Sequence, residues 1–253
     1  MKNRPARLII HCCFIPFLFA LTAVARDVQT GKRVEITTPD GIILSGLYHP
    51  PTSRSQKTFI LLHGLGSSQE EWQSFKDKLT AAGYGFLSYD ARGHGRSNRD
   101  TSNREISYQR FGNPGANSEW QKMLADLGSA VAFLNNEKYT PSKKIGLAGA
   151  SLGANVIINY AAGNKDIPLI VLLSPGLQYA GFESLKPLET LTKRSILIAA
   201  SPRDIYAYQS SILLHQRAQK NNTTVFMAGK SGHGVQMFDG RFGNQLIKWI
   251  NRH

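Results

Sequence analysis

Short apolar runs alternate with longer stretches of helical periodicity along the chain from residue 33 onward. The short runs are rich in β-branched and aliphatic residues, and they predict eight strands, at Arg33–Thr37, Leu44–His49, Thr58–Leu62, Gly85–Tyr89, Lys144–Ala148, Leu169–Leu173, Ser195–Ala200 and Thr223–Met227. The longer stretches predict helices at Ser68–Ala82, Glu119–Asn135, Leu152–Ala162, Tyr206–Lys220 and Phe238–Ile250. This alternation is typical of an α/β fold, in which helices cover both faces of a mostly parallel sheet.

The first two strands read as a hairpin, because Pro39-Asp40-Gly41 between them is a turn sequence. No internal repeat and no linker rich in Pro, Gly or Ser divides the chain, so we expect a single domain over residues 26–253. Ser97–Ser118 is the one long stretch without a periodic pattern. Loops of this length inside compact domains are often functional, although a solvated excursion is the simpler interpretation.

The first 25 residues have a different character. Three basic residues within the first seven are followed by the nearly uncharged run Leu8–Val24 and the small-x-small triplet Ala23-Val24-Ala25. This pattern predicts a signal peptide over residues 1–25 and an exported protein, periplasmic or secreted. The alternative is an uncleaved membrane anchor, since the run approaches the roughly 20 apolar residues of a span. Pro16 and His11 argue against a permanent span.

Composition narrows the class of protein. The 253 residues are 42% hydrophobic, which is too apolar for a disordered chain and suits one domain with a large core. Both cysteines, Cys12 and Cys13, fall in the predicted signal, so the exported chain would contain no disulfide. Cleavage would remove 25 residues, three of them basic and none acidic, and would leave 228 residues with a net charge of +10 instead of +13.

The positive charge raises the question of acidic partners. Five arginines lie close together in the sequence, at Arg92, Arg96, Arg99, Arg104 and Arg110. We favour a solvated basic surface over an anion-binding patch, because sequence spacing alone does not show that the side chains meet. We expect no nucleic-acid partner, since no nucleic-acid-binding motif accompanies the charge.

The clearest chemical signal is Gly149-Ala150-Ser151-Leu152-Gly153, which follows an apolar strand and opens a helix. In this context the motif predicts a nucleophile elbow, a tight strand-to-helix turn that lifts the serine hydroxyl clear of the main chain. Side chains two residues to either side would collide with the strand or the helix, which explains the glycines. The amide of Leu152 at the helix start can then donate to a developing oxyanion.

Two further motifs accompany the elbow. His63-Gly64-Leu65-Gly66 follows the third strand, and the eight residues Asp90-Ala91-Arg92-Gly93-His94-Gly95-Arg96-Ser97 follow the fourth. With these three motifs in this order, the chain resembles the α/β-hydrolase family over nearly all of its predicted mature length. The resemblance implies an α/β-hydrolase fold and a second oxyanion donor, the backbone amide of Leu65.

The resemblance also implies the partners of the serine. His233 lies just after the last strand, where the family places its catalytic imidazole, and Asp204 follows the seventh strand, the usual position of the acid that orients the imidazole. Glu183 is a second choice for the acid. His63 and His94 belong to motifs that shape the site in this family, so we expect them to be structural.

A catalytic set of Ser151, Asp204 and His233 implies a serine hydrolase that forms an acyl-enzyme, without cofactor or metal. Carboxylic esters of small or moderate size are the expected substrates. A peptidase or thioesterase of the same fold, or a catalytically silent binding protein, remain alternatives, and the oligomeric state stays open.

The connection Ser174–Lys193 is short, so we expect an open site without a large cap domain. Leu177–Phe182, and Ser97–Ser118 with Tyr108 and Phe111, are the segments expected to wall the substrate pocket.

Overall fold

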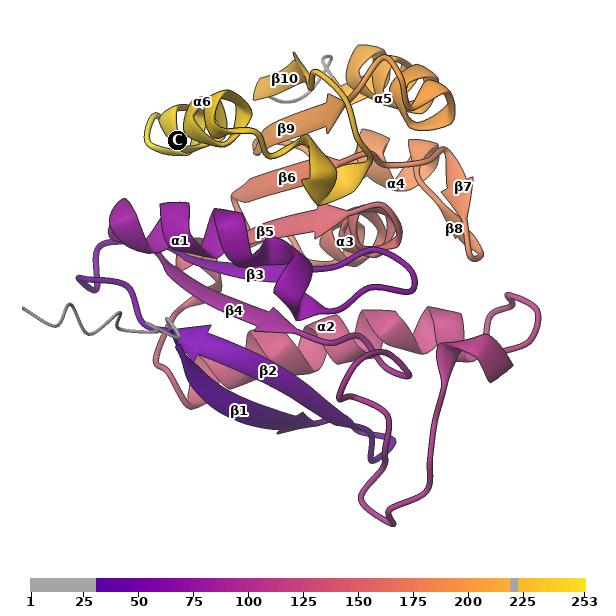
Figure 1. Cartoon of the computed structure of the whole chain (residues 1–253). Coiled ribbons are helices and arrows are strands. Elements are labelled where there is room, and N and C mark those ends of the chain that lie inside the picture. The colour runs from indigo at the N-terminus through magenta and orange to yellow at the C-terminus, as the bar shows by residue number, and fades with distance from the viewer. Residues whose placement is uncertain (1–30, 219–222) are drawn as a thin grey trace, which may run out of the picture.

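The fold was analysed in a computed structural model, which describes residues 31–218 and 223–253. The predicted signal peptide over residues 1–25 and both cysteines lie outside the described residues. The predicted α/β-hydrolase fold is confirmed: a mostly parallel sheet lies between two layers of helices (Figure 1).

The main sheet has eight strands in the order β1-β2-β4-β3-β5-β6-β9-β10. Their bounds are β1 Lys32–Thr37, β2 Ile43–His49, β3 Thr58–Leu62, β4 Gly85–Tyr89, β5 Ile145–Ala150, β6 Leu169–Leu173, β9 Ser195–Ala200 and β10 Thr223–Ala228. β1 and β2 form the predicted hairpin, and β2 also runs antiparallel to β4. All remaining neighbours are parallel, so their carboxyl ends share one edge of the sheet.

Two layers of helices cover the sheet. The α-helices are α1 Gln73–Ala81, α2 Glu119–Asn136, α3 Leu152–Gly163, α4 Leu185–Thr190, α5 Ile205–Ala218 and α6 Gly240–Ile250. Short 3₁₀ turns precede or connect them, η1 Gln69–Trp72, η2 Tyr108–Arg110, η3 Ser142–Lys144 and η4 Gly234–Met237. α1 and α6 pack together over one face, whereas α2, α3, α4 and α5 follow one another over the other (Figure 1).

The apolar side chains of the central strands alternate between two cores. Phe59 and Leu61 of β3 point into the core under α1 and α6, while Ile60 and Leu62 point into the core under α2 and α3. Successive side chains of a strand face opposite sides of the sheet, so a strand buried on both sides is apolar at most positions. This is why the central strands read as nearly continuous apolar runs, in which Thr58 and Ser88 are buried polar exceptions.

The connection between β6 and β9 contains elements that the sequence does not signal. A two-stranded ribbon, β7 Gln178–Tyr179 and β8 Phe182–Glu183, precedes the short helix α4. The ribbon turns at Ala180 and Gly181, which have φ angles of 48° and 81°. Two-residue strands are too short to display a period of two. No large cap domain is inserted here, as predicted.

Candidate active site

Ser151 occupies the turn between β5 and α3 with φ 51° and ψ −116°, a conformation that non-glycine residues rarely adopt. The neighbouring glycines make the turn possible. A Cβ on Gly149 would lie 2.5 Å from the carbonyl carbon of Gly153, and a Cβ on Gly153 would collide with the carbonyl oxygen of Leu62. The structure therefore contains the tight strand-to-helix turn that the glycine pattern predicts.

Main-chain hydrogen bonds hold the turn. The Ser151 N–H donates to Leu173 O of β6 (2.8 Å), and the Ser151 carbonyl accepts from the amides of Ala154 (3.0 Å) and Asn155 (3.2 Å). Since β5 and β6 are both buried, the backbone of Ser151 cannot shift without breaking these contacts. The strain of the positive φ is thus maintained by the surrounding sheet and helix.

His233 lies in the loop between β10 and η4, within hydrogen-bond distance of Asp204. His233 Nδ1 and Asp204 Oδ2 are 2.6 Å apart. Asp204 directly precedes α5 and is 18% exposed, whereas the imidazole is 47% exposed. A carboxylate accepts only, so Nδ1 carries the proton and Nε2 of a neutral ring is left to accept one.

The histidine loop is itself anchored to the sheet. The Gly234 N–H donates to Ser174 Oγ at the end of β6 (2.9 Å), and the His233 N–H donates to Gln236 Oε1 (3.1 Å). Gly232 and Gly234 have φ angles of 94° and 56°. Glycine adopts such positive φ angles more easily than other residues, which explains the glycines on both sides of His233.

One cavity of about 330 Å³ brings the predicted site residues together. Its lining includes Ser151, His233 and Leu65, which come from three different loops at the carboxyl edge of the sheet. Asp204 reaches the cavity through His233. Gly64 lies against the serine, because a Cβ added to it would sit 3.4 Å from Ser151 Cβ.

The two backbone amides predicted as oxyanion donors, those of Leu65 and Leu152, make no hydrogen bond with any other described residue. Leu152 is the first residue of α3, and the first amides of a helix have no partner within it. Within residues 31–218 and 223–253, no hydrogen bond joins Ser151 Oγ to His233 Nε2. In substrate-free active sites this contact is often longer than a hydrogen bond.

Glu71 lines the same cavity, and the sequence analysis did not identify it. Its Oε1 accepts from the Gly64 N–H (3.0 Å), and its carboxylate also interacts with the Ser67 hydroxyl. Burial raises the pKa of Glu71, against the lowering effects of these donors and of His233 nearby. Glu71 lies within a stretch that predicts only a helix, so nothing in the local pattern distinguished it from a solvated glutamate.

His63 and His94 have the structural positions expected of them. His63 Nε2 accepts from the Ala91 N–H (2.9 Å) and Nδ1 lies 2.7 Å from Gly64 O, so both ring nitrogens are used. Complete burial lowers the pKa of His63 to about 3. His94 is buried and stacks on Tyr108, with ring centroids 4.1 Å apart. Neither imidazole lines the cavity with Ser151.

Other candidates lie away from the cavity. Glu183 belongs to β8 and does not line it, and none of the five clustered arginines does. Arg92 is fully buried and is paired with Asp126, Asp40 and Glu119. Of the segments expected to wall the pocket, Leu177–Phe182 contributes Tyr179, whereas Ser97–Ser118 contributes no residue to the lining.

The described parts of the chain contain no group of three His, Cys, Asp or Glu side chains placed to hold a metal ion. Within residues 31–218 and 223–253, no helix has the length and apolar character needed to cross a bilayer.

Known proteins resemble this chain in sequence and fold. The family described as serine aminopeptidase, S33, matches residues 53–225. An uncharacterized protein of Mycobacterium tuberculosis is 24% identical over 247 residues, which cover 90% of this chain and 82% of that protein. A thiohydrolase of Aspergillus aculeatus is 24% identical over 180 residues, 69% of this chain and 52% of the thiohydrolase. The structure of a Pyrococcus furiosus esterase matches with a TM-score of 0.69 and 23% identity, over 88% of this chain and 92% of the esterase.

Proposed function

Because the chain belongs to the serine aminopeptidase S33 family of α/β-hydrolases, we propose that it is a serine hydrolase that cleaves carboxylic esters through an acyl-enzyme on Ser151. The observation that carries the proposal is one cavity lined by a strained serine, a carboxylate-bound imidazole and Leu65, whose backbone amide has no partner among the described residues. The second unpartnered amide, that of Leu152, belongs to the residue that directly follows the serine. Each of these features supplies one requirement of acyl transfer.

In the first half of the reaction, His233 Nε2 accepts the proton of the Ser151 hydroxyl as Oγ attacks the ester carbonyl carbon. The carbonyl π electrons move onto oxygen, and the amides of Leu65 and Leu152 donate to the resulting oxyanion. Asp204 holds the imidazole in the tautomer with Nδ1 protonated and stabilises the imidazolium that forms. When the intermediate collapses, the bond to the leaving oxygen breaks, and His233 returns the proton to give a free alcohol.

In the second half, a water molecule loses a proton to His233 and attacks the carbonyl carbon of the acyl-enzyme. The same two amides stabilise the second oxyanion. The bond between Ser151 Oγ and the acyl carbon breaks, the proton returns to Oγ, and the carboxylic acid leaves. The chemistry needs only the side chains and amides of the chain itself together with water.

A fluorophosphonate probe tests the nucleophile. We expect covalent labelling of the folded protein, with the added mass on Ser151, and no labelling of Ser151→Ala. Absence of labelling on folded protein would favour a catalytically silent binding protein. Labelling that survives Ser151→Ala would refute the assignment of the nucleophile.

A substrate panel tests the bond that is cleaved. Esters of one alcohol with increasing acyl length should be compared with the matching thioesters and with aminoacyl amides. The family description names aminopeptidases and one relative is a thiohydrolase, so both alternatives belong in the panel. Higher kcat/KM for the amides would indicate a peptidase, and higher kcat/KM for the thioesters would indicate a thioesterase.

We further propose that the protein is exported and that its signal is cleaved after Ala25. The basic head, the apolar run and the small-x-small triplet support this proposal. Mass measurement of the secreted protein should give a chain that starts near Arg26, and a chain that retains its first residues would contradict it.

A further inference from the structure

The charge of the cavity at Ser151 differs in sign from the net charge of the protein. The full sequence carries a net charge of +13, with 30 Lys and Arg. The cavity lining nevertheless contains no Lys or Arg, and its one carboxylate is Glu71. A binding site for an anionic substrate would be expected to contain positively charged side chains instead.

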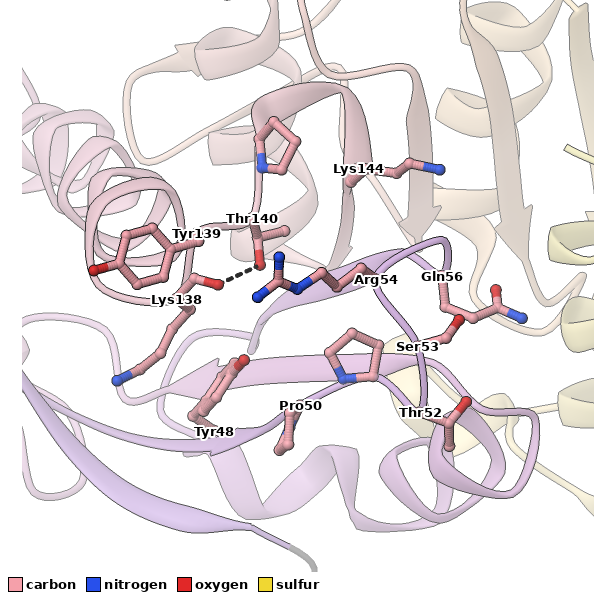
Figure 2. A pocket seen from close by; sticks show the side chains of 12 residues that line it. Tyr48, Pro50, Thr52, Ser53, Arg54, Gln56, Lys138, Tyr139, Thr140 and Lys144 are labelled. Carbon is pink, nitrogen blue, oxygen red and sulfur yellow. Dashed lines mark hydrogen bonds between the residues drawn. The ribbon is translucent and has the colours of Figure 1, made fainter.

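A second cavity shows that cations are available to line a pocket elsewhere in the fold. It has a volume of about 300 Å³ and lies beside the loops that precede β3 and β5 (Figure 2). Arg54, Lys138 and Lys144 line it without any Asp or Glu, and none of the three forms an ion pair with a described carboxylate. The absence of cations around Ser151 is therefore a local property of the catalytic cavity.

Glu71 has no Lys or Arg counter-ion among the described residues. The half-buried carboxylate receives neutral donors, the Gly64 amide at 3.0 Å and the Ser67 hydroxyl, and no Lys or Arg of the described chain pairs with it. A partly desolvated carboxylate gains from an opposite charge placed beside it. An incoming cation would provide that charge. The ring of Tyr179, which lines the same cavity, would add the attraction of an aromatic face for a cation.

The position of Glu71 indicates which part of the substrate would carry the positive charge. Glu71 and His233 line the same cavity and interact electrostatically, and in the proposed mechanism His233 protonates the leaving oxygen. A group bound beside Glu71 therefore belongs to the leaving alcohol. Building on the proposed function, we propose that the enzyme prefers esters whose leaving alcohol carries a positive charge, and that Glu71 binds this charge.

A pair of esters with the same acyl group and the same shape tests the preference. Choline butyrate and 3,3-dimethylbutyl butyrate differ in the replacement of a quaternary nitrogen by carbon, and hence in one positive charge. We expect kcat/KM of the wild-type enzyme to be about tenfold higher for the choline ester than for the neutral ester, as for one favourable contact of the quaternary nitrogen with a carboxylate and an aromatic ring. Glu71→Gln keeps an oxygen for the Gly64 amide and should reduce this ratio to about one. Because Glu71 also interacts with His233, the variant should lower kcat/KM for both esters, and the ratio between the two esters is therefore the readout.

Glu70→Gln is the matched control. Glu70 is the adjacent carboxylate, but it is exposed, bonds to Ser68 and does not line the cavity. This variant should keep the wild-type ratio. The wild-type enzyme provides a test that needs no variant, since free choline should inhibit hydrolysis of the neutral ester more strongly than 3,3-dimethylbutanol does.

Each outcome is decisive. A wild-type ratio near or below one, or a ratio that Glu71→Gln leaves unchanged, overturns the proposal even if Ser151-dependent hydrolysis of the neutral ester holds. A preference that appears only when the trimethylammonium group is moved to the acyl part, with a neutral alcohol, overturns the assignment to the leaving group. Failure of the wild-type enzyme to cleave any ester would refute the proposed function itself, and this inference with it.

Discussion

Replacing Asn155 by alanine should strongly lower the free energy of unfolding, although nothing in the sequence around Asn155 indicates such an effect. Asn155 lies one turn after Ser151 on α3 and is completely buried. Its Oδ1 accepts from the Gly176 N–H (3.0 Å), and its Nδ2 donates to Gly176 O and to Ser184 Oγ, both at 2.9 Å. One side chain thus binds both main-chain polar groups of a buried residue, Gly176, in the connection between β6 and β9.

The magnitude follows from the groups left behind. In Asn155→Ala the N–H and C=O of Gly176 lose their partner while they remain buried, and each such orphaned group costs about 1–3 kcal/mol. Allowing for some relaxation of the connection, we expect a loss of about 3 kcal/mol in the free energy of unfolding. For a domain of this size that corresponds to a fall of about 6–12 °C in Tm.

Urea denaturation measures the loss in the free energy of unfolding. An unchanged m-value would show that the folded and unfolded states are as compact as in the wild-type protein. Asn159→Ala is the matched control: Asn159 lies one turn further on α3 and donates to Glu183 O (2.8 Å), but it is partly exposed, so water can replace it. The control should lose no more than about 1 kcal/mol. A loss for Asn155→Ala as small as that of the control would refute the reasoning.

Three further predictions concern the site and its supports. Asp204→Asn should lower kcat/KM by about 10³–10⁴, because an amide cannot hold the His233 tautomer as the carboxylate does at 2.6 Å; a loss below about tenfold in stopped assays would contradict this. Gly153→Ala should cost about 1–3 kcal/mol in urea denaturation and reduce fluorophosphonate labelling, since its Cβ has no room beside β3, whereas wild-type stability would show that the turn relaxes. Burial would raise the pKa of Asp40, but hydrogen bonds and the charge of Arg92 outweigh it and lower that pKa to about 2. The ionised carboxylate therefore stabilises the fold above about pH 4 and loses this effect as the pH falls towards 2, so Asp40→Asn should flatten the decline in stability over that range.

Much of the fold was predictable because its central strands are buried on both faces. Every position of Thr58–Leu62 and of Leu169–Leu173 is buried, and all of these residues except Thr58 are apolar, so the runs stand out in the sequence. The ends of elements were less predictable. The helix expected at Phe238–Ile250 begins at Gly240, with Asp239 capping it through a 2.7 Å hydrogen bond from the Phe242 amide, and the preceding residues turn separately as η4.

The site was predictable where backbone sterics constrain residue type. Gly149 and Gly153 are required by the close approach of β3, β5 and α3, and that requirement leaves a motif. Glu71 and Asn155 leave no sequence motif. Their roles depend on hydrogen bonds to the main chain of Gly64 and Gly176, which lie in other segments of the chain. A glutamate or an asparagine on a helix face has no local property that reveals such a partner.

The sequence by itself determined the alternation of strands and helices and the glycine turn that carries Ser151, because burial on two faces and the lack of room for a Cβ act residue by residue. Only the tertiary structure decided which charges surround that serine. It buries Arg92 among three carboxylates and places Glu71 in the cavity with His233, where no Lys or Arg of the described residues pairs with it. Charge acts through space across loops that the sheet brings to one edge. Its distribution around the site therefore follows from the packing of the sheet and helices, and neither the net charge nor the sequence spacing of the arginines reveals it.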